Sequence, residues 1–168
     1  MTARPETSPQ PSLPSQAWLA CRSAAHICAL PLAAVTETMR PLPYEPFPTA
    51  PPFVSGIAII RGVPTPVVDM RALMGEQPLT SVGSAAAGRF VTVKINSRAV
   101  ALAFDAVLGV HNLNAGHVIG LPPLLKNVAG ETISDVAAKD TDLLLFFEAS
   151  RIFPPGLIES LMTDEAAS

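Results

Sequence analysis

The segment at residues 47–74, FPTAPPFVSGIAIIRGVPTPVVDMRALM, constrains the fold of this chain more than any other segment. Two short apolar runs, residues 54–60 and 63–68, predict the two strands of a hairpin. The second run contains two prolines, which lack an N–H group, so we expect its strand to lie at a sheet edge or to carry a bulge. Arg61 is the only charged residue inside the hairpin. One cation at a rigid turn suits contact with a partner better than catalysis, which needs several polar groups at one place.

The same pattern of short apolar runs separated by turns continues along the rest of the chain. Further strands are predicted at residues 18–21, 27–30, 35–39, 90–95, 99–104, 104–110, 118–121, 132–137 and 142–147. Little helix is expected: one turn at residues 31–34 and a short helix at residues 69–74, with Asp69 as its N-cap and Gly75 at its end. Many short strands with frequent turns indicate closed or nearly closed small barrels.

Proline also marks the segments that we expect to lie outside the regular structure. Residues 40–52 contain six prolines, which fix φ and remove backbone donors, and this predicts a rigid extended loop between strands. A ligand for an SH3-type domain is the alternative interpretation of this loop. Residues 1–15 are predicted to be a disordered Pro-rich tail, residues 16–153 a single domain, and residues 154–168 a C-terminal helix or tail.

The composition excludes several classes of partner. The net charge is −3 and the Lys and Arg residues do not cluster, whereas binding to a phosphate backbone needs several cations together, so we expect no nucleic acid. No apolar run reaches about 18 residues and the N-terminus has no apolar signal region, so we expect a cytoplasmic protein that does not insert into a membrane. Cys21 and Cys28 are expected to be buried free thiols on paired strands.

The sequence offers little support for catalysis. It lacks the phosphate-binding loop, the nucleophile elbow, the HExxH motif and paired Cys-x-x-Cys motifs. Asp69, Asp105, His111 and His117 are the residues that a small enzyme or a ligand-binding barrel would use, although both histidines fall on segments that look like loops. We therefore predict no enzymatic activity, no cofactor and no metal, and keep a ligand-binding barrel built on these four residues as a weaker alternative.

Three elements, taken together and in order, resemble the CheW family of bacterial chemosensory coupling proteins. Val35-Thr36-Glu37-Thr38 is similar to the V-x-E-I strand of that family. Residues 56–70, GIAIIRGVPTPVVDM, are similar to its G-[VI]-x-N-L-R-G-x-x-[LI]-P-V-[IV]-D-L motif, and residues 104–110, FDAVLGV, to its V-D-x-V-x-G-V element. Ile59 stands where the motif has Asn, and Ile60 where it has Leu.

The resemblance implies an all-β fold of two intertwined five-stranded SH3-like β-barrels with short helices. It implies two partners, the regulatory domain of a CheA-type histidine kinase and the cytoplasmic tip of a methyl-accepting chemotaxis receptor. Arg61 and Gly62 would lie at the partner surface, and Val35, Glu37, Val107 and Val110 would border a receptor groove. A kinase-binding or localisation factor without receptor contact, for example in a pilus-motility system, is the alternative function.

Overall fold

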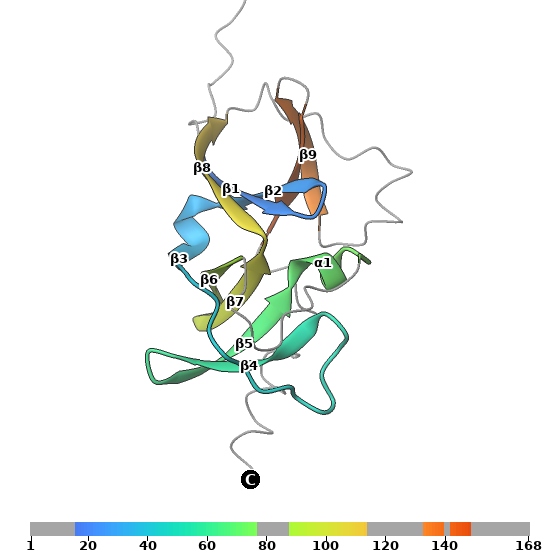
Figure 1. Cartoon of the computed structure of the whole chain (residues 1–168). Coiled ribbons are helices and arrows are strands. Elements are labelled where there is room, and N and C mark those ends of the chain that lie inside the picture. Colours follow the sequence, from blue (N-terminus) through green and yellow to red (C-terminus); the bar gives the residue numbers. More distant parts are fainter. Residues whose placement is uncertain (1–15, 77–87, 114–132, 140–141, 149–168) are drawn as a thin grey trace, which may run out of the picture.

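The computed structural model describes residues 16–76, 88–113, 133–139 and 142–148, and these form two five-stranded sheets (Figure 1). Sheet A has the strand order β8-β1-β2-β10-β9, and sheet B has the order β3-β6-β7-β5-β4. The strands are β1 Gln16–Ser23, β2 His26–Pro31, β3 Val35–Met39, β4 Val54–Ile60, β5 Val63–Asp69, β6 Arg89–Ile95, β7 Arg98–Phe104, β8 Ala106–Leu113, β9 Ile133–Lys139 and β10 Asp142–Phe147. The predicted all-β class and the two five-stranded units are confirmed, with each sheet open rather than closed into a complete barrel.

The path of the chain makes the two sheets intertwined. Strands β1 and β2 begin sheet A, the chain then forms all of sheet B, and β8 to β10 return to complete sheet A. Within sheet A, β10 lies parallel to β2, and within sheet B, β5 lies parallel to β7. Parallel neighbours cannot be joined by a tight turn, so these pairings tie together segments that are distant in the sequence.

The three predicted hairpins were predicted correctly. Strand β4 has the predicted bounds, whereas β1, β2, β5, β6 and β7 are each longer than the apolar run that identified them. Strands β1 and β2 pair from Trp18 to the turn, with Cys21 directly opposite Cys28. The β6–β7 turn contains Asn96 and Ser97, both with positive φ (50° and 67°), as in the turns whose twist matches that of paired strands.

The expectation that the Pro-containing strand lies at a sheet edge is wrong for the strand as a whole. Strand β5 lies between β4 and β7, and the irregular register falls in β4, between Val54 and Gly56. However, β5 pairs with β7 only from Val67 onward, and both Pro64 and Pro66 precede that residue. The prolines are tolerated because, among the described strands, this half of β5 pairs with β4 alone.

A shared hydrophobic core joins the sheets. Its fully buried members come from both sheets and include Cys21, Cys28, Val68, Leu102, Phe104 and Phe147. Each sheet has a second, smaller cluster on its other face. In sheet B half of the buried members of that cluster are alanines, namely Ala58, Ala101 and Ala103, and Leu42 and Tyr44 of the Pro-rich loop pack against it.

The two short helices follow the sequence signals. Leu32–Ala34 form a single 3-10 turn after Pro31, as predicted. Helix α1, Met70–Leu73, begins after Asp69, whose carboxylate accepts hydrogen bonds from the backbone N–H groups of Arg71 (2.9 Å) and Ala72 (3.3 Å). Asp69 is therefore the N-cap that the sequence predicted.

Several predictions concern residues outside those that the structure describes: the Pro-rich tail at 1–15, the strand at 118–121, the C-terminal segment at 154–168, and His117. Their assignments stay predictions. His111, in contrast, is described, and its placement on a loop is wrong. Strand β8 extends to Leu113, and His111 lies opposite Trp18 within it. Among the described residues, no helix is long and apolar enough to span a membrane.

Candidate protein-binding site

Arg61 lies at the tip of the β4–β5 hairpin, which projects from the body of the molecule (Figure 1). Arg61 and Gly62 both have positive φ, 51° and 77°, so two consecutive left-handed residues make this turn. A side chain in the left-handed region costs free energy that glycine avoids, and asparagine is the more usual residue at such a position. The turn itself therefore does not explain why an arginine stands here.

The guanidinium of Arg61 makes a bidentate ion pair with Glu37 of strand β3. Arg61 Nε donates to Glu37 Oε1 (2.9 Å) and Nη2 donates to Oε2 (2.7 Å). Strand β3 is an edge strand of sheet B, so the pair joins that edge to the tip of the β4–β5 hairpin. The hydrogen bond from Arg61 lowers the pKa of Glu37 below its ordinary value, which keeps this carboxylate charged.

Exposed apolar side chains surround the tip of the hairpin. Ile59 before the turn is 60% exposed and Val63 after it is 50% exposed, while the side chain of Arg61 is 78% exposed. Exposed large apolar residues that adjoin one fixed charge are typical of a surface that contacts another protein. Arg61 and the change at Ile59 stand out in the sequence, whereas the exposure of Ile59 and Val63 on either side of the cation was not predicted.

The remaining predicted site residues lie near the junction of the two sheets. Val35 begins β3, Val107 lies near the start of β8, and both are half-buried and pack against the shared core. Val110, three residues further along β8, is 53% exposed, and its neighbour Leu108 is also exposed. The structure thus brings Glu37 and Arg61 into contact and places Val35 and Val107 against one core, whereas Val110 extends the apolar surface along the edge of sheet A.

The alternative site was built on Asp69, Asp105, His111 and His117, of which the structure describes the first three. These three side chains do not form a common site. The Asp69 carboxylate caps α1, and Asp105 binds Arg71 through a hydrogen bond of 2.7 Å. His111 lies within β8. In the described part of the chain, no three His, Cys, Asp or Glu side chains are grouped so that they could hold a metal ion.

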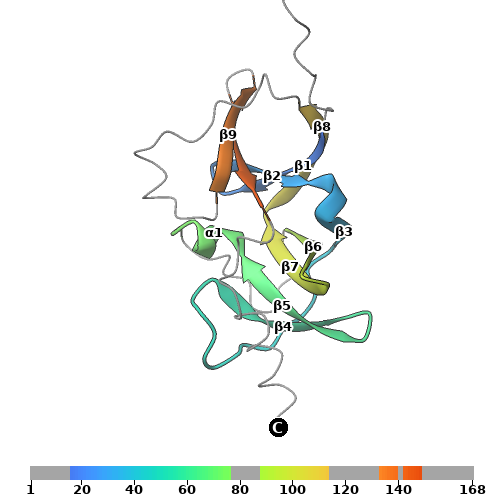
Figure 2. The same ribbon diagram turned by 180° about the vertical axis from the view of Figure 1, so that it is seen from behind.

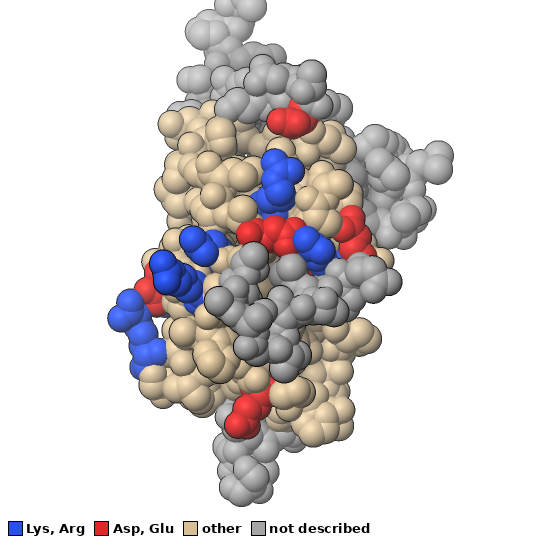
Figure 3. Space-filling model, viewed as in Figure 1, with Lys and Arg blue, Asp and Glu red and all other residues tan. Residues whose placement is uncertain are grey.

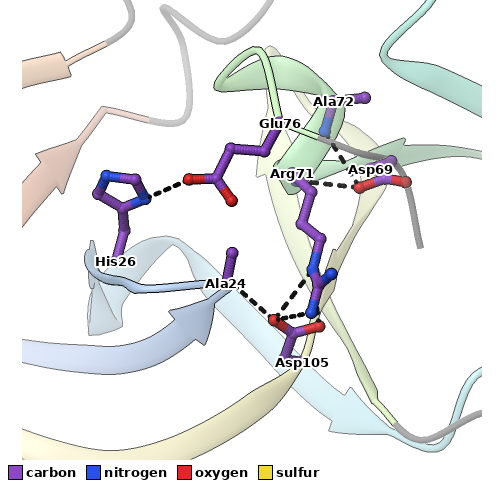
Figure 4. Close-up of polar contacts among 7 residues, drawn as sticks. All are labelled: Ala24, His26, Asp69, Arg71, Ala72, Glu76 and Asp105. Atoms are coloured by element: carbon purple, nitrogen blue, oxygen red, sulfur yellow. Dashed lines mark hydrogen bonds and ion pairs between the residues drawn. The ribbon is translucent and has the colours of Figure 1, made fainter.

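Sequence reasoning missed a group of polar contacts between the sheets, drawn in Figure 4. We call this group the seam cluster; its members are Ala24, His26, Arg71, Glu76 and Asp105. Arg71 from α1 binds the Asp105 carboxylate, Ala24 N–H donates to Asp105 Oδ2 (2.6 Å), and His26 Nδ1 lies 2.9 Å from Glu76 Oε1. The space-filling view shows charged side chains in a band across the middle of one face, where the sheets meet (Figure 3).

Comparison with known proteins agrees with this architecture. The profile of the CheW-like domain family matches residues 17–154 of this chain. The chain belongs to the CheW family. A chemotaxis protein CheW from Rhizobium meliloti (strain 1021) is 24% identical over 123 residues, which are 73% of this chain and 77% of that protein. The crystal structure of the scaffolding protein TtCheW from Thermoanaerobacter tengcongensis superposes with a TM-score of 0.71 at 21% identity, covering 83% of this chain and 92% of that one.

Membership of the CheW family accounts for the positions of the three motifs that the sequence analysis quoted. The first motif falls on β3, the second on the β4–β5 hairpin, and the third on the end of β7 and the start of β8. The contact between the first two motifs is the Glu37–Arg61 pair itself. The role of each residue in binding a partner stays a prediction.

Proposed function

We propose that this protein is a non-enzymatic adaptor that couples chemoreceptors to a CheA-type histidine kinase. Membership of the CheW family supports the adaptor class, and the similar TtCheW is described as a scaffolding protein. The observation that carries the proposal is the bidentate Glu37–Arg61 pair, which fixes an exposed cation between the exposed apolar side chains of Ile59 and Val63.

The Arg61 side of the Glu37–Arg61 ion pair is exposed to solvent. Exposed ion pairs contribute little to stability because water and salt screen them, so stability alone does not account for an arginine in a left-handed turn. A guanidinium held by two hydrogen bonds has already lost most of its conformational freedom, and less entropy is lost when a partner binds it. With Ile59 and Val63 on either side, the hairpin tip presents a rigid, mostly apolar surface, and we assign it to the kinase.

The receptor would bind where the two sheets adjoin. A receptor tip is a helical hairpin, and amphipathic helices dock into apolar surfaces with a few polar groups at the rim. Val35 and Val107 supply half-buried apolar surface, Val110 supplies exposed apolar surface, and Glu37 supplies a rim charge. This surface draws on both sheets, whereas the hairpin tip belongs to sheet B alone.

The first experiment measures the affinity of the purified protein for the regulatory domain of a CheA-type kinase from the same cell. Arg61→Glu is the test variant, and Arg98→Glu, at the exposed β6–β7 turn, is a control with the same change of charge. We expect binding in the micromolar range or tighter, weakened about tenfold or more by Arg61→Glu and unchanged by Arg98→Glu. A well-folded wild-type protein that does not bind would refute the kinase assignment.

A charge-swap variant separates contact with the partner from positioning of the hairpin. Glu37→Arg combined with Arg61→Glu can re-form the ion pair with the charges exchanged. If Arg61 contacts the kinase directly, the double variant binds as weakly as Arg61→Glu alone. Restored affinity would instead mean that the pair acts by holding the hairpin against β3.

Val110→Glu tests the receptor surface. Leu143→Glu is the matched control, because Leu143 is a similarly exposed apolar residue of sheet A (55%, against 53% for Val110). We expect Val110→Glu to weaken binding of a receptor tip and to leave kinase binding intact. A wild-type protein that binds the kinase but no receptor tip would favour the alternative function, a kinase-binding or localisation factor.

A further inference from the structure

Asp105 is the residue at which the chain passes from sheet B to sheet A. It is the single residue between β7, which ends at Phe104, and β8, which begins at Ala106. Its backbone N–H donates to the carbonyl of Arg22 (2.8 Å), and its carboxylate accepts from Ala24 N–H, so Asp105 is bound to the β1–β2 hairpin of sheet A through both its backbone and its side chain.

The same carboxylate is also bound to sheet B. Arg71 Nε lies 3.1 Å from both oxygens, and Arg71 Nη2 donates to Oδ2 (2.7 Å). Arg71 belongs to α1, which directly follows β5. One side chain therefore connects the first hairpin of sheet A, the helix of sheet B, and the crossing between the sheets. A second contact joins the same hairpin to the segment just after α1, between His26 and Glu76, as Figure 4 shows.

The helix of the seam cluster and strand β3 of the predicted receptor surface lie on opposite sides of the junction. In Figures 1 and 2, α1 lies on one side of the molecule, while β3 and the upper part of β8 lie on the other. Strand β3 carries Val35 and Glu37. Strand β8 carries Val107 two residues from Asp105, close to the seam cluster, and Val110 further along the strand. A polar contact that fixes one side of a junction between two rigid sheets also sets how far apart their other sides lie.

We propose that Arg71 and Asp105 are positioning residues that set the angle between the two sheets and thereby align the two halves of the receptor surface. The inference rests on the proposed function for its binding consequence, but the geometric part concerns this chain alone. The kinase surface on the β4–β5 hairpin lies within one sheet and does not depend on that angle. Loss of the Arg71–Asp105 pair therefore weakens receptor binding selectively.

The test compares Arg71→Gln, which removes the charge, with Arg71→Lys, which keeps it. A distance between the sheets is measured by pulsed electron resonance between spin labels on Lys94→Cys and Asp142→Cys, which are exposed sites on sheets B and A outside both proposed surfaces. The native cysteines are fully buried and are not expected to take the label. Val67→Ala, in the smaller core cluster of sheet B, is the control for a general loss of stability. Arg71→Gln and Val67→Ala are each measured at the same number of degrees below their own Tm.

We expect Arg71→Gln to shift or broaden the distance distribution, to weaken receptor-tip binding about tenfold, and to leave kinase binding within about twofold of wild type. For Arg71→Lys we expect values between those of Arg71→Gln and wild type. Val67→Ala is expected to change neither the distance distribution nor the affinity for the receptor tip or the kinase. An unchanged distance distribution in Arg71→Gln would overturn the proposal, as would an equal loss of both binding activities. If the wild-type protein binds neither partner, the proposed function fails, and the distance measurement alone decides whether the pair sets the angle.

Discussion

Replacing Gly56 by alanine is the substitution whose cost can be worked out most directly from the structure. A Cβ atom on Gly56 would overlap the carbonyl oxygen of Glu45 and would lie 2.6 Å from its carbonyl carbon and 3.0 Å from the nitrogen of Pro46. All three are backbone atoms, so no side chain can move aside. The loop at residues 40–53 must move away from β4.

That movement breaks a pair of backbone hydrogen bonds. Glu45 N–H donates to the Ile57 carbonyl (2.9 Å), and Ile57 N–H donates to the Glu45 carbonyl (2.8 Å). At about 1 kcal/mol each, their loss costs about 2 kcal/mol. For a chain of this length, that free energy corresponds to a fall in Tm of about 4–8 °C. Leu42 and Tyr44, which pack against the sheet B cluster from the same loop, add to the cost if they are displaced.

Urea and thermal unfolding measure the loss, and hydrogen exchange at the Ile57 amide locates it. Gly62→Asn is the control, because a Cβ at Gly62 has nothing within 4 Å and asparagine tolerates a positive φ. We expect the control to change the free energy of unfolding by less than about 0.5 kcal/mol. The steric argument is refuted if Gly56→Ala behaves like the control, or if the Ile57 amide stays as protected as in wild type.

The remaining predictions concern the helix cap, the thiols and the ion pair. Asp69→Ala removes the acceptor for two N–H groups of α1 and is expected to cost about 1 kcal/mol in urea unfolding; an unchanged midpoint would contradict the capping role. Burial raises the pKa of Cys21 to about 12 and that of Cys28 further, so neither thiol should react with a thiol reagent at neutral pH until the protein unfolds. Because unfolded thiols ionise first, stability should fall as the pH rises from about 9 toward about 12. Arg61→Gln should raise the pKa of Glu37 toward its ordinary value of 4.5, as followed by carboxyl NMR, and a pKa that does not move would show that the pair is absent in solution.

Local patterns were enough to predict most of the strands and turns. Residues 142–147, for example, were predicted with the same bounds that β10 has, because a turn precedes an uninterrupted apolar run. Asp69 was recognised as an N-cap because its position before a short helical segment and Gly75 is a local signal. The error at β5 arose because the proline rule concerns individual hydrogen bonds, whereas the sequence does not show where along β5 the pairing with β7 begins.

The candidate site was predictable only in part. Arg61 stood out because it is a lone charge between two apolar runs, and the motif resemblance identified Glu37 as a second residue, but nothing in the sequence joined them. Their contact depends on tertiary structure, since Glu37 lies on the edge strand β3 and Arg61 lies in the β4–β5 turn, 24 residues further along the chain. The Arg71–Asp105 pair was missed for the same reason, since its partners lie 34 positions apart in the sequence and no local pattern joins them.

The intertwined path of the chain has a consequence for how the protein folds during synthesis. Sheet B is built from one continuous segment, from Val35 in β3 to Phe104 in β7, and is complete before β8 has been made. In sheet A, the outer sides of β1 and β2 stay unpaired until β8 and β10 have been made. These pairings join segments that are distant in the sequence, and such contacts form slowly because a long loop must close. A nascent or truncated chain can therefore present the Arg61 surface without the Val110 surface. If the two surfaces bind a kinase and a receptor as proposed, such a chain would occupy the kinase without linking it to the receptor, and the late addition of β8 and β10 would separate a connecting molecule from a competing one.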